Sequence, residues 1–166
     1  MGSKGKNDLD EIIVGSTTEK ITRTSKIPVL VVKNENEEFR IKELVFASDF
    51  EEDSKKSFEL FLDFAKKFES KIHLLKINTA QKFENTNTVK ETIETFLKDF
   101  EVPKYTICVY NDSTIEKGIS NFSKDIDADI IAITTHGRNR LSRFFNGSIS
   151  KKLTQKALRP VLTFMI

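Results

Sequence analysis

The residues best suited to chemistry form a glycine-containing segment near the end of the chain, TTHGRNRLSRFFNGSIS. Its frame consists of Thr134, Gly137, Gly147 and Ser148. Glycine lets a backbone approach a phosphate closely, and a Gly-Ser pair opens a helix whose free N–H groups and dipole favour an anion. The hydroxyls of Ser148 and Ser150 can donate to the same anion. The segment therefore predicts a phosphate-binding loop; the alternative is that Gly-Ser simply starts a helix.

Other motifs for nucleotide chemistry do not occur in the chain. Neither GxxxxGK[ST] nor GxGxxG is found, which disfavours a P-loop hydrolase and a Rossmann oxidoreductase. No general base stands beside the glycine segment, so we assign no catalytic residue and expect at most slow hydrolysis. One cysteine and two histidines cannot supply a Cys/His zinc site, and we assign no metal ligand.

The glycine segment is the second copy of an internal repeat. Identical residues recur 132 positions apart: Gly5 and Gly137, Gly15 and Gly147, Ser16 and Ser148, Pro28 and Pro160. Each copy reads as a glycine loop, a Gly-Ser pair, a helix and a strand that begins at proline. Only the second copy follows a full set of strands and helices. We therefore interpret 1–33 as the C-terminal remnant of a first lobe, 34–40 as a linker and 41–166 as a complete domain.

The hydrophobic pattern predicts the scaffold that must position this loop. Short apolar runs predict buried strands at 44–47, 72–77, 105–110, 130–133 and 160–166. Apolar residues at helical spacing lie between these runs. The regular alternation predicts an α/β fold, a doubly wound five-stranded parallel sheet with helices on both faces. Ligands bind such sheets at the carboxyl ends of the strands, so we expect a site after Phe46, Ile77 and Ile133.

Two pairs of residues mark predicted helix starts. Thr88 with Glu91, and Ser113 with Glu116, have the spacing of capping boxes. Asp49 follows the first predicted strand of the domain, and it is either a cap of the next helix or a contact to a ligand.

Composition excludes several classes of protein. The 166 residues carry 27 Lys and Arg against 25 Asp and Glu, a net charge of +2. This balance argues against a nucleic-acid partner. No apolar stretch is long enough for a membrane span, and no signal peptide is visible, so we expect a cytoplasmic protein. The single thiol, Cys108, fits a reducing compartment, and its environment predicts a structural role.

The frame G-x2-G-x9-G-S, followed by a helix and PVLVV, resembles the universal stress protein family. Further segments carry the resemblance through the domain: ELVFASDFEEDS, KIHLLKI, DADIIAITTHGR and RPVLTF. The arrangement is similar to the tandem type, with the first lobe mostly missing. The resemblance implies a stress-response regulatory protein that binds ATP or another adenine nucleotide, with Mg²⁺ as a candidate companion ion.

The resemblance also implies roles for individual residues. Asp49 matches the acidic residue that contacts the nucleoside, and Ile77 matches the position whose backbone contacts adenine. The phosphate positions are matched by Gly137, Gly147 and Ser148, with Ser150 as a further hydroxyl. The family also implies assembly through the last strand. We expect strands 28–32 and 160–164 to pair within or between chains, as a pseudo-dimer or a homodimer.

One frame position departs from the family pattern. Thr134 stands where the family has its first glycine, and a β-branched residue there is stiff and narrows the approach to phosphate. This departure motivates a second hypothesis, a dimeric interaction module of the same fold that binds no nucleotide. A phosphate-handling enzyme is a third hypothesis, and it lacks a base that we can name.

Overall fold

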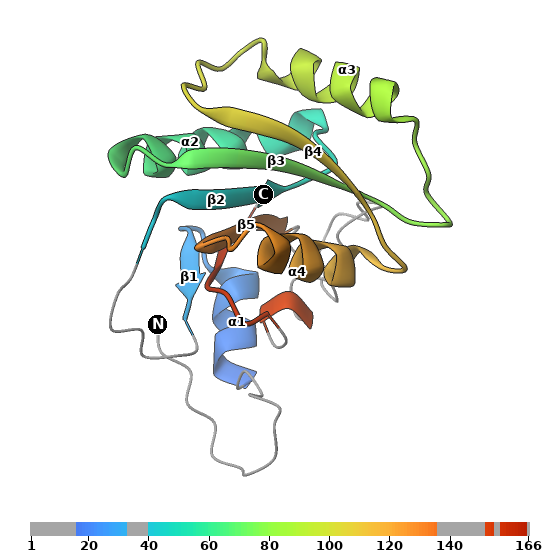
Figure 1. Ribbon diagram of the computed structural model, residues 1–166. Coiled ribbons are helices and arrows are strands. Elements are labelled where there is room, and N and C mark those ends of the chain that lie inside the picture. The colour runs from blue at the N-terminus through green and yellow to red at the C-terminus, as the bar shows by residue number, and fades with distance from the viewer. Residues whose placement is uncertain (1–15, 33–39, 136–151, 155–156, 166) are drawn as a thin grey trace.

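The computed structural model describes residues 16–32, 40–135, 152–154 and 157–165. Its centre is one sheet in the order β1-β6-β5-β2-β3-β4 (Figure 1). The strands are β1 Val29–Val31, β2 Glu43–Ala47, β3 Lys71–Asn78, β4 Tyr105–Asn111, β5 Ile130–Thr135 and β6 Val161–Met165. The helices are α1 Ser16–Thr24, α2 Lys55–Lys67, α3 Thr86–Leu97 and α4 Ile115–Asp125, with a 3-10 turn Glu52–Ser54 before α2.

The prediction of five parallel strands was incomplete. The strands from β2 to β6 are parallel to their neighbours, but β1 adds a sixth strand that runs antiparallel to β6. The sheet is therefore mixed. β1 comes from the first copy of the repeat, which the prediction placed outside the domain, so it was not counted among the five strands.

Alternate residues of the central strands face opposite helix layers, as the strand period requires. Leu44 and Phe46 of β2 lie in a core cluster with α2 and α3, whereas Val45 and Ala47 lie in a second cluster with α4. The two clusters confirm helices on both faces. They also explain why β2 reads as a continuous apolar run: both of its faces are covered.

The core on the α2/α3 side is rich in phenylalanine. Phe58 is fully buried, and its ring centroid lies 5.0 Å from that of Phe46 and 4.9 Å from that of Phe100, in edge-to-face contacts. Aromatic pairs in this geometry add about 0.5–1.5 kcal/mol to the free energy gained by burial. This cluster fixes α2 and α3 against the sheet and thereby fixes the loops at the carboxyl ends of the strands.

The pairing of β1 with β6 follows the internal repeat. Val29 lies opposite Thr163, Leu30 opposite Leu162, and Val31 opposite Val161. Leu30 and Leu162 are also the equivalent positions of the two repeat copies. The two strands are therefore related by a local two-fold axis that passes through the pair Leu30 and Leu162. The predicted pairing of the two repeat strands thus occurs within one chain. As a result, β1 occupies the edge of β6 that faces away from β5.

None of the described helices combines the length and apolar character that crossing a bilayer would require.

Candidate functional site

The carboxyl ends of β2, β3 and β5 meet at one edge of the sheet. Ala47 at the end of β2 pairs with Leu75 on one side and with Ile133 on the other. From β2 the chain proceeds to β3 and β4 on one side and later returns to β5 and β6 on the other. The strand order thus reverses between β2 and β5, which is where ligands bind in open α/β sheets.

Three of the predicted site residues lie at this edge. Asp49 follows β2, Ile77 is the penultimate residue of β3, and Thr134 is the penultimate residue of β5. The other four predicted residues lie outside the part of the chain that the structure describes: Gly137, Gly147, Ser148 and Ser150.

The Asp49 carboxylate is only 6% exposed, and one of its oxygens organises the turn after β2. Oδ1 accepts long hydrogen bonds from the hydroxyls of Ser48 and Ser54, at 3.4 and 3.3 Å, and from the Glu51 N–H at 3.4 Å. Oδ2 makes no hydrogen bond to the described residues. Asp49 does not cap the following helix, because neither the 3-10 turn nor α2 has a side-chain cap. One oxygen holds the turn instead, and the other is available to a ligand.

The turn after β2 is strained. Phe50 has a φ of 61°, in the left-handed region that non-glycine residues enter at a cost of about 1–3 kcal/mol. The Phe50 N–H donates to the Ser48 hydroxyl at 3.0 Å, and its ring packs edge-on against Phe96 with centroids 5.5 Å apart. These contacts keep the sharp turn and hold Asp49 at the end of the strand.

Lys76, a cation in the same place, was not among the residues predicted from the sequence. Lys76 is only 7% exposed. Its ammonium donates to the Asp49 carbonyl at 3.3 Å and lies 3.3 Å from the Glu84 carboxylate. A lysine inside the apolar run KIHLLKI was the available signal, because a buried charge in a strand requires partners.

The Ile77 backbone is placed to contact a ligand. The Leu75 carbonyl accepts from the Ser48 N–H at 3.2 Å, and this is the last backbone bond between β2 and β3 in the described residues. In a parallel ladder, alternate residues bond to the same neighbour, so the N–H and carbonyl of Ile77 point to the same side as those of Leu75. Because β2 has ended, they face the space beyond Asp49.

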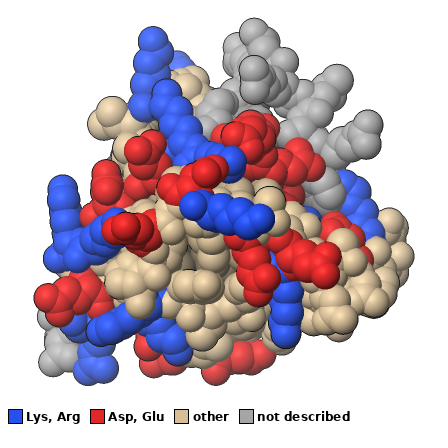
Figure 2. Space-filling view, turned by 90° about the horizontal axis from the view of Figure 1, so that it is seen from above, with Lys and Arg blue, Asp and Glu red and all other residues tan. Residues whose placement is uncertain are grey.

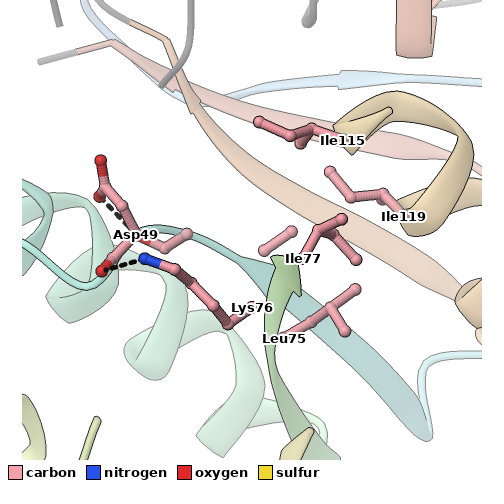
Figure 3. A pocket seen from close by; sticks show the side chains of 8 residues that line it. Asp49, Leu75, Lys76, Ile77, Ile115 and Ile119 are labelled. Carbon is pink, nitrogen blue, oxygen red and sulfur yellow. Dashed lines mark hydrogen bonds between the residues drawn. The ribbon is translucent and has the colours of Figure 1, made fainter. Parts of the chain in front are cut away.

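A small recess lies between these groups (Figure 3). Its wall is polar at Asp49 and Lys76 and apolar where Ile77 faces Ile115 and Ile119 of α4. Its volume is about 10 Å³, which is room for about one water molecule. A purine could enter this recess only if the side chains of its wall moved.

Thr134 fills a position that a glycine would leave open. Its side chain is 1% exposed, and its hydroxyl has no hydrogen-bond partner in the described part of the chain. An unsatisfied buried hydroxyl costs about 1–3 kcal/mol. Thr134 pairs with Phe164 of the α2/α3 core cluster, so its side chain lies on the α2/α3 face of the sheet, whereas the recess opens on the α4 face.

Metal ligands are scarce at this edge. No group of three or more His, Cys, Asp or Glu side chains among the described residues could hold a metal ion. Mg²⁺ commonly binds through one or two carboxylates together with substrate phosphates. Asp49 could supply one such carboxylate, whereas Glu84 is engaged by Lys76.

The fold and site define a doubly wound α/β protein with a candidate ligand site at its switch point. The sequence model of the universal stress protein family matches residues 1–33 and, separately, 40–164. The chain therefore belongs to the universal stress protein family. The first match coincides with the first copy of the repeat, and the second covers the domain that ends in the second copy.

Individual relatives agree with this assignment. The universal stress protein MJ0577 of Methanocaldococcus jannaschii is 56% identical over 36 residues, 22% of each chain. A universal stress protein structure from Archaeoglobus fulgidus DSM 4304 has a TM-score of 0.72 at 21% identity, over 99% of this chain and 59% of that one. The chain thus spans about three fifths of that protein's length.

Two shorter solved structures contain nucleotides. A universal stress protein in complex with cAMP has a TM-score of 0.59 at 10% identity, over 76% of this chain and 96% of that one. A universal stress protein from Archaeoglobus fulgidus in complex with dAMP has a TM-score of 0.55 at 14% identity, over 76% and 98%. At sequence identities of 10% and 14%, the similarity to these two structures shows a shared fold.

Proposed function

We propose that this chain is a stress-response regulatory protein that binds ATP or another adenine nucleotide at the carboxyl ends of β2, β3 and β5. The observation that carries the proposal is the meeting of Asp49, Ile77 and Thr134 at the switch point of the sheet. The cAMP and dAMP complexes of two proteins with this fold support the choice of ligand.

Each residue has a role in this proposal. Asp49 accepts from the ribose through Oδ2, and the Ile77 backbone bonds the adenine edge. The phosphates lie on the glycine loop, at Gly137, Gly147, Ser148 and Ser150, where helix N–H groups favour an anion. Mg²⁺, if bound, is held mainly by the phosphates, because the free oxygen of Asp49 is used by the ribose. No described residue stands out as a general base, so the protein binds nucleotide without rapid turnover.

The proposal extends to organisation and setting. Residues 1–33 are the C-terminal part of a first lobe, 34–40 a linker and 41–166 a complete domain. Two lobes would meet through β1 and β6, whose register has local two-fold symmetry. We place the protein in the cytoplasm, without a nucleic-acid or membrane partner.

A second function is favoured by two observations at the same edge of the sheet. The recess holds about 10 Å³, and Thr134 occupies a glycine position of the family. In this alternative the domain binds no nucleotide and acts as a dimeric interaction module. Both observations concern side chains at one edge, so substitution there separates the two functions.

Calorimetric titration with ATP and Mg²⁺ tests the proposal. We expect weak binding by the parent chain and at least about tenfold tighter binding by Thr134→Gly, which is about 1.4 kcal/mol. Thr134→Ser keeps the hydroxyl and removes the methyl group, so it isolates the steric contribution. Asp49→Asn keeps an acceptor for the turn and should weaken binding.

Two results would decide against the nucleotide proposal. Absence of heat and of a thermal shift at millimolar ATP, for the parent and for Thr134→Gly, would leave the interaction module as the function. Rapid ATP turnover that Asp49→Asn abolishes would instead support an enzyme.

A further inference from the structure

The two edges of the sheet differ in how they are protected. β1 forms one edge and has three residues, whereas β4 forms the other and has seven. Natural edge strands are commonly kept short or carry charged residues, proline or a bulge, which prevents pairing with another chain. The β4 sequence, YTICVYN, contains no charged residue, no proline and no glycine. It lacks these sequence-level protections.

The hydrogen-bond pattern shows which residues of β4 face outward. The Lys104 carbonyl accepts from the Ile72 N–H at 2.9 Å, and the Asp112 N–H donates to the Asn78 carbonyl at 3.0 Å. Even-numbered residues therefore bond to β3, and in a parallel ladder the alternate residues must point the other way. The N–H and carbonyl groups of Tyr105, Ile107, Val109 and Asn111 thus face the open edge, where no described residue bonds to them.

Charges of opposite sign flank this uncharged strand at equal distances from its centre. Lys104 precedes β4 and Asp112 follows it, and Cys108 lies midway between them. Lys104 is exposed and has no ion pair with another described residue. The Asp112 carboxylate is held by the Asn121 side chain at 2.8 Å and by the Ser113 N–H at 2.6 Å. An antiparallel pairing centred on Cys108 would bring the two charges together.

We propose that the outer edge of β4 pairs antiparallel with β4 of a second copy of this chain, with Cys108 opposite the partner's Cys108. Lys104 then lies opposite the partner's Asp112, and the same pair occurs again at the other end. Ile107 lies opposite the partner's Val109, and Tyr105 opposite the partner's Asn111. In an antiparallel ladder, two opposite residues form a hydrogen-bonded pair only if the backbone groups of both point toward the partner strand. The proposed register meets this condition, because each outward-facing residue lies opposite another outward-facing residue.

This register has a chemical signature. Cys108 bonds inward to β3, so the two copies of Cys108 would form a non-hydrogen-bonded pair, with Cα atoms about 4.5 Å apart. Disulfides form at Cα separations of about 4.4–6.8 Å. Cys108 is half-buried and is the single cysteine of the chain, so a covalent dimer can form through this position alone.

The uncharged strand and the flanking charges favour a second copy over an extended peptide of another protein. The face toward α3 and β4 carries charges of both signs, interspersed with uncharged surface (Figure 2). A general peptide would receive no specific match from Lys104 and Asp112, whereas an antiparallel copy satisfies both. The proposed assembly uses the edge opposite β1 and is independent of nucleotide binding.

Oxidative cross-linking of the full chain tests the register. With copper phenanthroline we expect a disulfide-linked dimer of the parent. Thr106→Cys with Cys108→Ser moves the thiol along the same face, and the two thiol positions are then about 13 Å apart, too far for a disulfide. This variant should cross-link at least about tenfold more slowly, and adding Tyr110→Cys should restore the rate. Equal rates for the parent and the displaced thiol would overturn the proposed register.

Sedimentation velocity of Cys108→Ser tests the assembly without a covalent bond. Lys104→Glu places like charges together at both ends and should weaken dimerisation about tenfold at low salt. Lys104→Glu with Asp112→Lys reverses both charges and should restore it. Lys98→Glu, an exposed change elsewhere, should have no effect. A monomer at all concentrations up to about 1 mM, or equal dimerisation of Lys104→Glu and the parent chain, would overturn the proposal.

Discussion

At the scale of single residues, Gly118 of α4 shows how closely the site is packed. A Cβ atom at this position would lie 2.8 Å from Ile77 Cγ2, 3.0 Å from Ile77 Cδ1 and 3.1 Å from Asp112 Cβ. Alanine is a better helix former than glycine by about 1 kcal/mol, whereas overpacking costs about 1–3 kcal/mol. We expect Gly118→Ala to lower the free energy of unfolding by about 1 kcal/mol, measured by urea denaturation.

The matched control for this substitution is Lys117→Ala, because Lys117 is exposed on the same helix. It should change stability by less than about 0.5 kcal/mol. A gain of stability in Gly118→Ala would mean that Ile77 moves aside freely, and the wall of the recess would then be adaptable. This result would also remove the main steric objection to a purine in the recess.

The sequence predicted where part of the candidate site lies in the fold, and the reasons for the misses are physical. Asp49, Ile77 and Thr134 were placed correctly at one edge, because parallel strands bring their carboxyl ends together. Lys76 was missed, since its partners come from the loop after β2 and from Glu84, and sequence spacing does not reveal such contacts. The strained turn at Phe50 was missed for the same reason, because non-glycine residues seldom adopt this φ.

At the scale of elements, Asp129 ties the start of β5 to the start of β2. One carboxylate oxygen accepts from the Lys42 N–H at 2.8 Å and from the Glu43 N–H at 2.9 Å. Hydrogen bonds to charged groups contribute about 1.5–3 kcal/mol each, less at exposed positions. We expect Asp129→Ala to destabilise the fold by about 1–3 kcal/mol in thermal or urea unfolding. Asp63→Ala, at an exposed position of α2, should have little effect; equal losses in the two variants would refute this role.

The phenylalanine cluster makes a second prediction at this scale. Phe58 is fully buried, and its ring contacts those of Phe46, Phe61, Phe96 and Phe100. Phe58→Ala should cost about 3–5 kcal/mol through lost burial and a cavity, measured by equilibrium denaturation. Phe83 is 72% exposed, so Phe83→Ala should be nearly neutral. A small effect at Phe58 would show that the surrounding rings collapse into the space.

Element boundaries were less predictable than element types. The predicted capping box at Thr88 lies inside α3, because Asn85 caps the helix and accepts from the Asn87 N–H at 2.9 Å. Likewise, Thr114 rather than Ser113 caps α4, accepting from the Lys117 N–H at 3.3 Å. Several capping residues stand in succession at both places, and tertiary packing selects among them.

At the scale of the whole molecule, the internal repeat and the sheet explain each other. The equivalent residues Leu30 and Leu162 lie opposite each other across β1 and β6. Equivalent strands that meet antiparallel at equivalent residues have two-fold symmetry, which is the usual symmetry of paired subunits. The repeat and the strand at 28–32 were both predicted from the sequence, but the antiparallel register with β6 was not, because the register of a three-residue strand depends on the packing of both copies.

The acid dependence of stability is a property of the whole molecule, and it has a definite sign. Hydrogen bonds from Asn121 and the Ser113 N–H lower the pKa of the Asp112 carboxyl. Burial raises the pKa of Glu116, but the hydrogen bond from Lys152 and further interactions outweigh it, so this pKa is also lowered. A carboxyl whose pKa is lower in the folded chain stabilises the fold above its unfolded pKa, near pH 4. That stabilisation is lost as the pH falls through the folded pKa.

We therefore expect the free energy of unfolding to decline as the pH falls from about 5 to 3. Glu116 connects the start of α4 to Lys152, with its carboxylate 2.5 Å from the ammonium, so this loss weakens a contact between distant parts of the chain. Asp112→Asn and Glu116→Gln should each flatten the decline in urea titrations at a series of pH values. Glu94→Gln, on the exposed side of α3, should leave the decline unchanged. If Asp112→Asn and Glu116→Gln follow the parent curve as Glu94→Gln does, other carboxyls govern acid unfolding. The contacts of Asp112 and Glu116 would then not contribute to the pH dependence of stability.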